Sequence, residues 1–102
     1  MVPDEVATLM ELKDLRARLT QLDGELLALI AERQRISEEV ARAKRATGLP
    51  TRDFQRERDV LMNARAAAEK LGLSPSLADK LLRLLIRSSL ATQEQAQVAA
   101  QG

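Results

Sequence analysis

The chain has 102 residues, which we expect to form a single domain over 1–102, and its 16 Lys and Arg nearly balance 15 Asp and Glu. It contains no His and no Cys, which excludes imidazole proton shuttles, His-activated nucleophiles and His or Cys metal sites. A net charge of +1 disfavours nucleic-acid partners, and the short apolar runs predict neither a membrane span nor a secretory signal, so we expect a cytoplasmic protein.

The first part of the chain is predicted to be one long helix that ends at Gly48 and Pro50. Its predicted start is Asp4, or Thr8 with Glu11 as a capping box. Apolar residues recur every three or four positions, as in a coiled coil, at Leu12, Leu15, Leu19, Leu22, Leu26, Leu29, Ile36, Val40 and Ala43. Roughly 40 helical residues form a rod of about 60 Å, whereas a compact domain of this size has a radius of gyration of about 13 Å. The remaining residues cannot cover such a helix, so the pattern predicts a second copy of the chain against it.

Two shorter helices are predicted in the rest of the chain. The first follows Asp53, a capping residue, and runs for about 18 residues to Gly72. The second starts at Ser74 with a proline at its first helical position and fades into a tail rich in Gln and Ala. With loose ends at 1–7 and 96–102, the sequence predicts an all-α fold of one very long and two shorter helices.

Polar residues interrupt the apolar faces of two predicted helices. Arg33 stands where the long helix should continue its apolar pattern, and Lys44 falls on the same face eleven residues later. Ser89 and Gln93 continue an apolar face of the last helix. Any one of them is more simply explained as a register-setting charge or a solvated group. Two cations and two hydrogen-bonding groups together favour a pocket between helices for a small anionic molecule.

Three separated segments resemble the all-helical, AroQ-type chorismate mutases. They are LRARLTQLDGELLALIAERQRISEEVARAK (15–44), PTRDFQRERDVL (50–61) and LIRSSLATQEQ (85–95), within a resemblance that spans about positions 12–95. The resemblance implies an intertwined homodimer of three-helix subunits that form a helical bundle with two equivalent active sites. It also implies an isomerase of phenylalanine and tyrosine biosynthesis, which converts chorismate to prephenate by an intramolecular 3,3-sigmatropic (Claisen) rearrangement without a cofactor or a metal.

The resemblance assigns the substrate's two carboxylates to two arginines, Arg16 and Arg33. These residues lie 17 positions apart, which separates them by about 100° around a helix and about 25 Å along it, so one chain cannot bring both to one site. In the family the equivalent of Arg16 comes from the partner subunit, which agrees with the second copy predicted from the helix length.

The other site residues also follow from the resemblance. Lys44 and Gln93 match the two donors to the ether oxygen of the breaking C–O bond, and Glu57 matches the carboxylate that accepts a hydrogen bond from the ring hydroxyl. Charge develops on the ether oxygen in the transition state, so fixed donors there stabilise it more than the ground state. With Arg33, these three residues are the predicted catalytic group. Further substrate-binding positions are Asp53, Arg56 and Ser89.

The sequence leaves two alternative functions open. Isochorismate-pyruvate lyases share the fold and act on a similar dianionic ether, although the motif around Glu57 favours the mutase. A non-catalytic helical module that dimerises or regulates another aromatic-pathway enzyme would use the same apolar pattern without the pocket.

Overall fold

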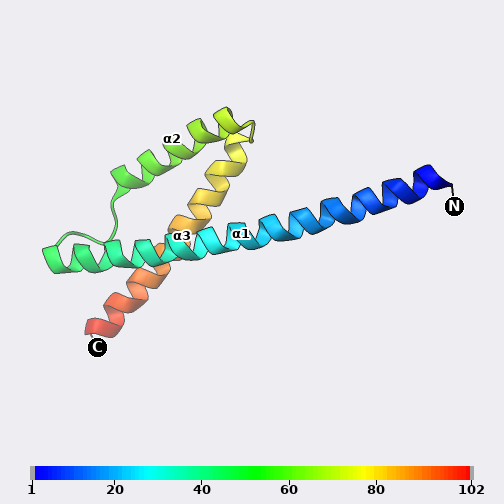
Figure 1. The fold of residues 1–102 in the computed structure, drawn as a ribbon. Helices are drawn as coiled ribbons and strands as arrows, with labels where there is room; N and C mark the ends of the chain where they lie inside the picture. The colour runs from blue at the N-terminus through cyan, green and yellow to red at the C-terminus, as the bar shows by residue number, and fades with distance from the viewer. Residues whose placement is uncertain (1, 102) are drawn as a thin grey trace. The chain divides into compact units, whose positions relative to one another are not determined.

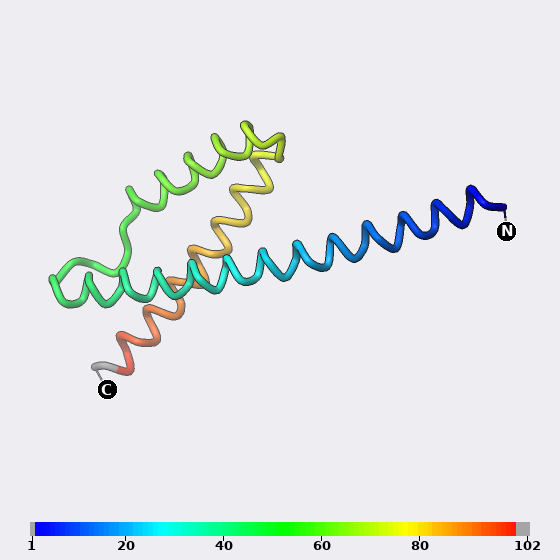
Figure 2. Tube along the Cα trace, in the orientation of Figure 1, coloured from blue at the N-terminus to red at the C-terminus, as the bar shows by residue number. Residues whose placement is uncertain are grey.

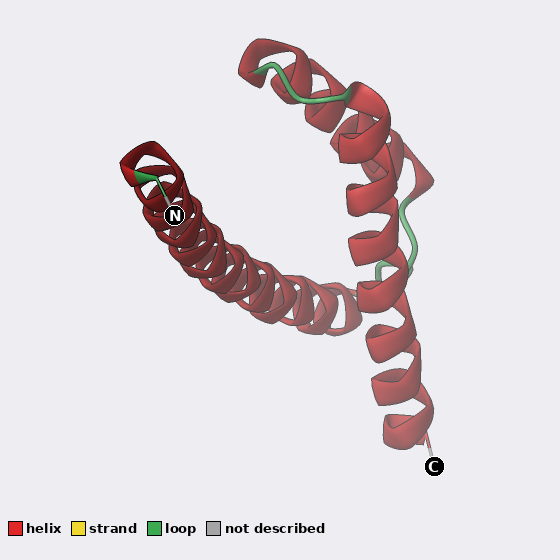
Figure 3. Cartoon of the chain, turned by 90° about the vertical axis from the view of Figure 1, so that its right-hand side faces the viewer, coloured by secondary structure: helices red, strands yellow, loops and turns green. Residues whose placement is uncertain are grey.

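The computed structural model describes residues 2–101, and the side chains of residues 2–99, as three α-helices joined by two loops (Figure 1). Helix α1 spans Pro3–Thr47, α2 spans Phe54–Leu71 and α3 spans Pro75–Gln101. Within the described residues all regular structure is helical, as Figure 3 shows. The predicted all-α class, with one long and two shorter helices, is confirmed.

The chain divides into two compact units, and the boundary falls inside α1 between Arg35 and Ile36. The first unit is the N-terminal part of α1. The second contains the end of α1 together with α2 and α3, which follow one another along the trace in Figure 2. None of the described helices is both long and apolar enough to cross a membrane.

The first unit exposes a row of leucines, the leucine stripe. Its members are Leu12, Leu15, Leu19, Leu22, Leu26 and Leu29, and they are 41% to 64% exposed. Their spacing by three and four residues places them along one side of the helix. The chain's own residues leave this apolar side largely in contact with water, which is unfavourable by about 25 cal/mol for each Å².

Helix α1 starts before both of its predicted starts. Its first residue is Pro3, which suits a first helical position because proline has no N–H to leave unpaired. The Thr8 hydroxyl donates to the Asp4 carbonyl at 2.9 Å, so Thr8 lies inside the helix. The predicted capping box at Thr8 is therefore wrong, and the alternative start at Asp4 differs by one residue.

Local signals set the other helix boundaries. Gly48 and Gly72 follow α1 and α2 with φ of +73° and +71°, a left-handed conformation that glycine adopts without strain. The Asp53 carboxylate accepts a hydrogen bond from the Arg56 backbone N–H at 3.0 Å and caps α2. The Ser74 hydroxyl oxygen accepts one from the Leu77 N–H at 3.3 Å at the start of α3. These boundaries agree with the predicted ones.

The C-terminal part of α3 differs from the sequence-based expectation. The helix continues to Gln101, whereas the sequence pattern predicted fading after Gln95 and a loose tail over 96–102. Gln and Ala have high helix propensity, and the segment contains no glycine or proline before its end. The described residues 96–101 are thus helical, as are residues 3–7 at the other end of the chain.

Helices α2 and α3 pack against each other within the second unit. The buried apolar residues of the described chain are mostly small, namely Ala41, Ala68, Ala78 and Leu85. Asp79 of α3 is also buried, and its carboxylate pairs with the Nε of Arg65 on α2 at 3.1 Å and the Nε of Arg83 on α3 at 2.6 Å. The hydrogen bond from Arg83, followed by the one from Arg65, lowers the pKa of the Asp79 carboxyl. This cluster therefore connects the two helices as long as Asp79 is ionised.

We expect Asp79→Asn to lower the melting temperature at pH 7 because it removes the charge that both arginines meet. A lowered pKa in the folded state stabilises the fold above the unfolded pKa of about 3.9, and this stabilisation is lost as pH falls through the folded-state value. Thermal unfolding followed by circular dichroism at pH 7 and pH 3 should show the difference between variant and wild type shrinking at pH 3. Glu69→Gln, on the exposed surface of α2, is the control. An equal difference at both pH values would contradict the role of the charge.

Candidate active site

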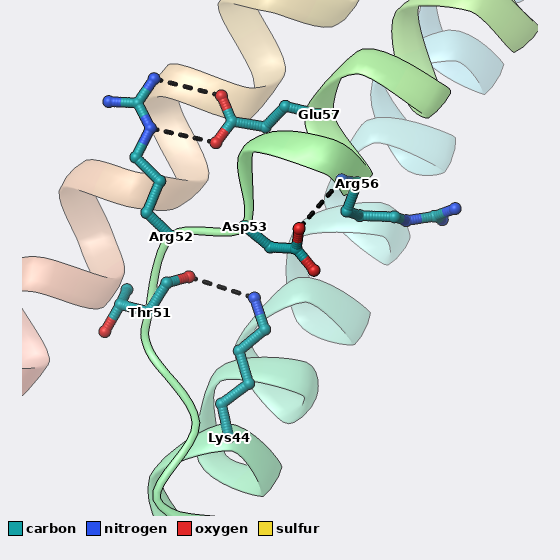
Figure 4. A network of polar contacts seen from close by, with 6 residues as sticks. All are labelled: Lys44, Thr51, Arg52, Asp53, Arg56 and Glu57. Carbon is teal, nitrogen blue, oxygen red and sulfur yellow. Dashed lines mark hydrogen bonds and ion pairs between the residues drawn. The ribbon is translucent and has the colours of Figure 1, made fainter.

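Lys44 lies in the last turn of α1 and is half-buried. Its Nζ donates to the backbone carbonyl of Thr51, in the loop before α2, at 3.1 Å (Figure 4). A cation in the last helical turn also interacts favourably with the helix dipole. An ammonium group has three donors, so this bond orients Lys44 and leaves N–H groups for another acceptor.

The loop before α2 is connected to α3 through the side chain of the same residue. The Thr51 hydroxyl donates to Gln97 Oε1 at 3.1 Å. Gln97 lies in the segment that the sequence predicted to be loose, and it follows Ser89 and Gln93 at helical spacing on α3. The end of α3 thereby supports the loop that holds Lys44.

Glu57, in the first turn of α2, is engaged by Arg52. The Nε and Nη2 of Arg52 donate to the two Glu57 carboxylate oxygens at 3.0 and 3.1 Å (Figure 4). The Arg52 guanidinium also lies 4.5 Å from the centroid of the Phe54 ring. Each carboxylate oxygen has a second lone pair, so Glu57 can still accept a hydrogen bond from a hydroxyl. Sequence reasoning missed Arg52 because its partner is five residues away across a loop, outside any helical spacing.

Asp53 and Arg56 contribute to the same segment in different ways. The Asp53 carboxylate caps α2 and so fixes the direction in which the helix starts. In Figure 4 the Arg56 side chain extends away from Glu57. Both residues shortly precede Glu57 in the chain, and any contact of theirs with a substrate stays a prediction.

Gln93 is 7% exposed, and its carboxamide lies against Ser37 on α1. Its Nε2 is 3.3 Å from Ser37 Oγ and 3.4 Å from the Ser37 carbonyl, while its Oε1 is buried without a hydrogen-bond partner. Ser89, one turn earlier on α3, is also buried. A buried polar atom without a partner costs about 1–3 kcal/mol, and binding sites are where such a cost is commonly found.

Sequence reasoning did not identify Ser37, although a signal was available. Ser37 stands seven residues before Lys44, a spacing that places both on one helical face. A polar residue on that face, between two predicted site residues, is the same anomaly that identified Arg33.

The structure places the predicted site residues in two groups. The second unit contains Lys44, Asp53, Arg56, Glu57, Ser89 and Gln93. The first unit carries Arg16, which is exposed, and Arg33, which is half-buried. The residues in the second unit combine an ammonium, a carboxamide and a carboxylate, which together can bind and polarise an anionic ligand rich in oxygen atoms.

Comparisons with known proteins identify the family of the chain. The family model described as chorismate mutase type II matches residues 15–94. A T-protein from Haemophilus influenzae is 39% identical over 84 residues, which cover 82% of this chain and 22% of the relative. A bifunctional chorismate mutase/prephenate dehydratase from Escherichia coli K12 is 38% identical over 80 residues, covering 78% of this chain and 21% of the relative.

A shorter relative is matched over most of its length. A chorismate mutase from Methanocaldococcus jannaschii is 28% identical over 85 residues, which cover 83% of this chain and 86% of the relative. The chain spans about a fifth of the length of the two longer relatives. Because the family model covers most of the chain, from residue 15 to residue 94, the protein belongs to the chorismate mutase type II family.

Proposed function

We propose that the protein converts chorismate to prephenate by an intramolecular Claisen rearrangement, as an isomerase in the biosynthesis of phenylalanine and tyrosine. The observation that carries this proposal is that one compact unit contains two positioned side-chain donors, the half-buried ammonium of Lys44 and the buried carboxamide of Gln93. The reaction moves bonds within one molecule, so it requires neither a nucleophile nor a proton carrier. Its rate increases when fixed donors stabilise the ether oxygen of the breaking bond, which becomes more negative in the transition state.

Three side chains of the second unit receive roles in this reaction. Lys44 and Gln93 donate to the ether oxygen of the breaking bond, and Glu57 accepts from the ring hydroxyl. The contact of Lys44 with the Thr51 carbonyl and that of Glu57 with Arg52 support these roles, because preformed contacts limit the reorganisation needed when the substrate binds.

The arginines of the first unit bind the substrate's carboxylates in this proposal. Arg33 acts in the site of its own chain, and Arg16 acts in the site of a second copy. The exposed leucine stripe supports a homodimer, since a second α1 is the simplest cover for an apolar side of this length. Binding the folded conformer of a flexible dianion also lowers the entropic part of the barrier. A cytoplasmic location, suggested by the composition, completes the proposal.

The direct test is to follow the absorbance of chorismate after adding the purified protein and to identify the product. We expect prephenate. Isochorismate serves as the parallel substrate, because pyruvate released from it would indicate the lyase instead. A protein that leaves both compounds unchanged would contradict the proposed activity and favour a non-catalytic helical module.

We expect the mutase rate to be nearly constant between about pH 5 and pH 8. The donor Gln93 does not titrate, and Lys, Arg and Glu have reference pKa values outside this window. A Gln93→Glu variant should gain activity as pH falls, because a carboxyl must be protonated before it can donate. Measuring kcat over this range for both proteins tests the assignment. A steep fall of the wild-type rate within the window would contradict Gln93 as the donor.

A further inference from the structure

Ser37 holds the carboxamide of Gln93 from the side of α1. Both Ser37 atoms within reach, Oγ at 3.3 Å and the carbonyl oxygen at 3.4 Å, lie next to Nε2. The other end of the amide, Oε1, is buried and has no hydrogen-bond partner. The Nε2 end of this carboxamide is thus hydrogen-bonded within the protein, and the Oε1 end has no partner.

The two Ser37 oxygens differ in the hydrogen bonds that they can form with the amide. The backbone carbonyl only accepts, so it favours an amide whose Nε2 faces α1. The hydroxyl can accept from Nε2, and it can also donate to Oε1 if the amide turns by 180°. Only the turned amide leaves Nε2 at the unpartnered position, where it can donate to a ligand.

We propose that Ser37 is a positioning residue for the rearrangement, and this inference rests on the proposed mutase function. In the substrate complex its hydroxyl donates to Gln93 Oε1 and thereby directs Nε2 toward the ether oxygen. Ser37 does not touch the substrate in this arrangement. Its position supports the role, because Ser37, the buried Ala41 and Lys44 follow one face at the end of α1.

The decisive variant is Ser37→Ala, which leaves only the backbone carbonyl beside the amide. Alanine is a better helix former than serine, so the substitution itself does not weaken α1. Because one hydrogen bond is lost, we expect kcat to fall about three- to tenfold. KM should change less than about twofold, since the bond acts on a transition-state donor. Ser37→Thr keeps a hydroxyl and should restore most of the loss.

Two further measurements separate positioning from a purely structural contact. Ser37→Ala added to Gln93→Ala should cause no further loss of kcat, because the hydroxyl then has no amide to direct. Ser76→Ala, an exposed serine at the start of α3, is the matched control and should leave kcat unchanged. Melting temperatures are recorded for every variant.

Each outcome tests either the positioning role of Ser37 or the proposed mutase function. An active wild type whose kcat does not respond to Ser37→Ala would overturn the positioning role alone. The same loss in the presence and absence of the Gln93 carboxamide would also overturn it, as would a loss that follows only the melting temperature. A wild type that forms no prephenate would overturn the mutase function and, with it, this inference.

Discussion

Lys44→Ala should lower kcat for chorismate by about 100- to 1,000-fold, the loss typical of removing one fixed donor from a developing oxyanion. The ammonium donates to an oxygen whose negative charge grows in the transition state, so kcat should fall more than KM rises. The initial rate of chorismate loss, measured over a range of substrate concentrations, separates the two parameters.

The contact between Lys44 and the Thr51 carbonyl requires its own control, because the substitution could loosen the loop. Thr51→Val removes the hydroxyl bonded to Gln97 and keeps the backbone carbonyl that Lys44 uses. We expect this variant to lose far less activity than Lys44→Ala. Lys70→Ala, an exposed lysine at the end of α2, should remain fully active. Equal rates for Lys44→Ala and the wild type would refute the proposed site.

Mixing two inactive variants, Arg16→Ala and Lys44→Ala, should restore activity to about a quarter of the wild-type level. If Arg16 acts across a two-fold dimer, one of the two sites in each mixed dimer contains intact Arg16 and Lys44. Random exchange makes about half of the dimers mixed. The measurement is the mutase rate of the mixture after joint refolding or co-expression. The mixed dimer alone, isolated by two different affinity tags, should reach about half of the wild-type rate.

The control for this mixture is the pair Arg33→Ala and Lys44→Ala. In the proposal both residues serve the site of their own chain, so each site of the mixed dimer lacks one of them and no activity should return. An isolated mixed dimer of Arg16→Ala and Lys44→Ala that stays inactive would contradict the crossing of Arg16. Recovery in both mixtures would contradict the placement of Arg33.

The helix boundaries were largely predictable because they depend on local chemistry. Gly48 and Gly72 adopt the left-handed conformation at helix ends, and Asp53 and Ser74 cap the helices that follow them. These effects involve residues within one turn of each other, which is the range that a sequence pattern describes well. The wrong prediction of a capping box at Thr8 also has a local cause. The Thr8 hydroxyl donates to the Asp4 carbonyl inside the helix and does not cap it.

The contacts that support the site could not be read from the pattern. Ser37 and Gln93 are 56 positions apart, and Thr51 and Gln97 are 46 apart, so their pairing depends on how α1, the loop and α3 pack. The family resemblance supplied the residues that would touch a substrate, because those define its motifs. It gave no information on Arg52, which holds Glu57 through a loop conformation.

The small buried residues of the second unit also determine which substitutions the protein tolerates at their positions. At Ala41, Ala68 and Ala78 the space is defined by a methyl group, so the limiting property at these positions is volume and not hydrophobicity. A leucine would match their polarity and still force the helices apart. In a library of random variants, substitutions at these alanines should be depleted in proportion to side-chain size, with serine and glycine surviving longer than valine or leucine.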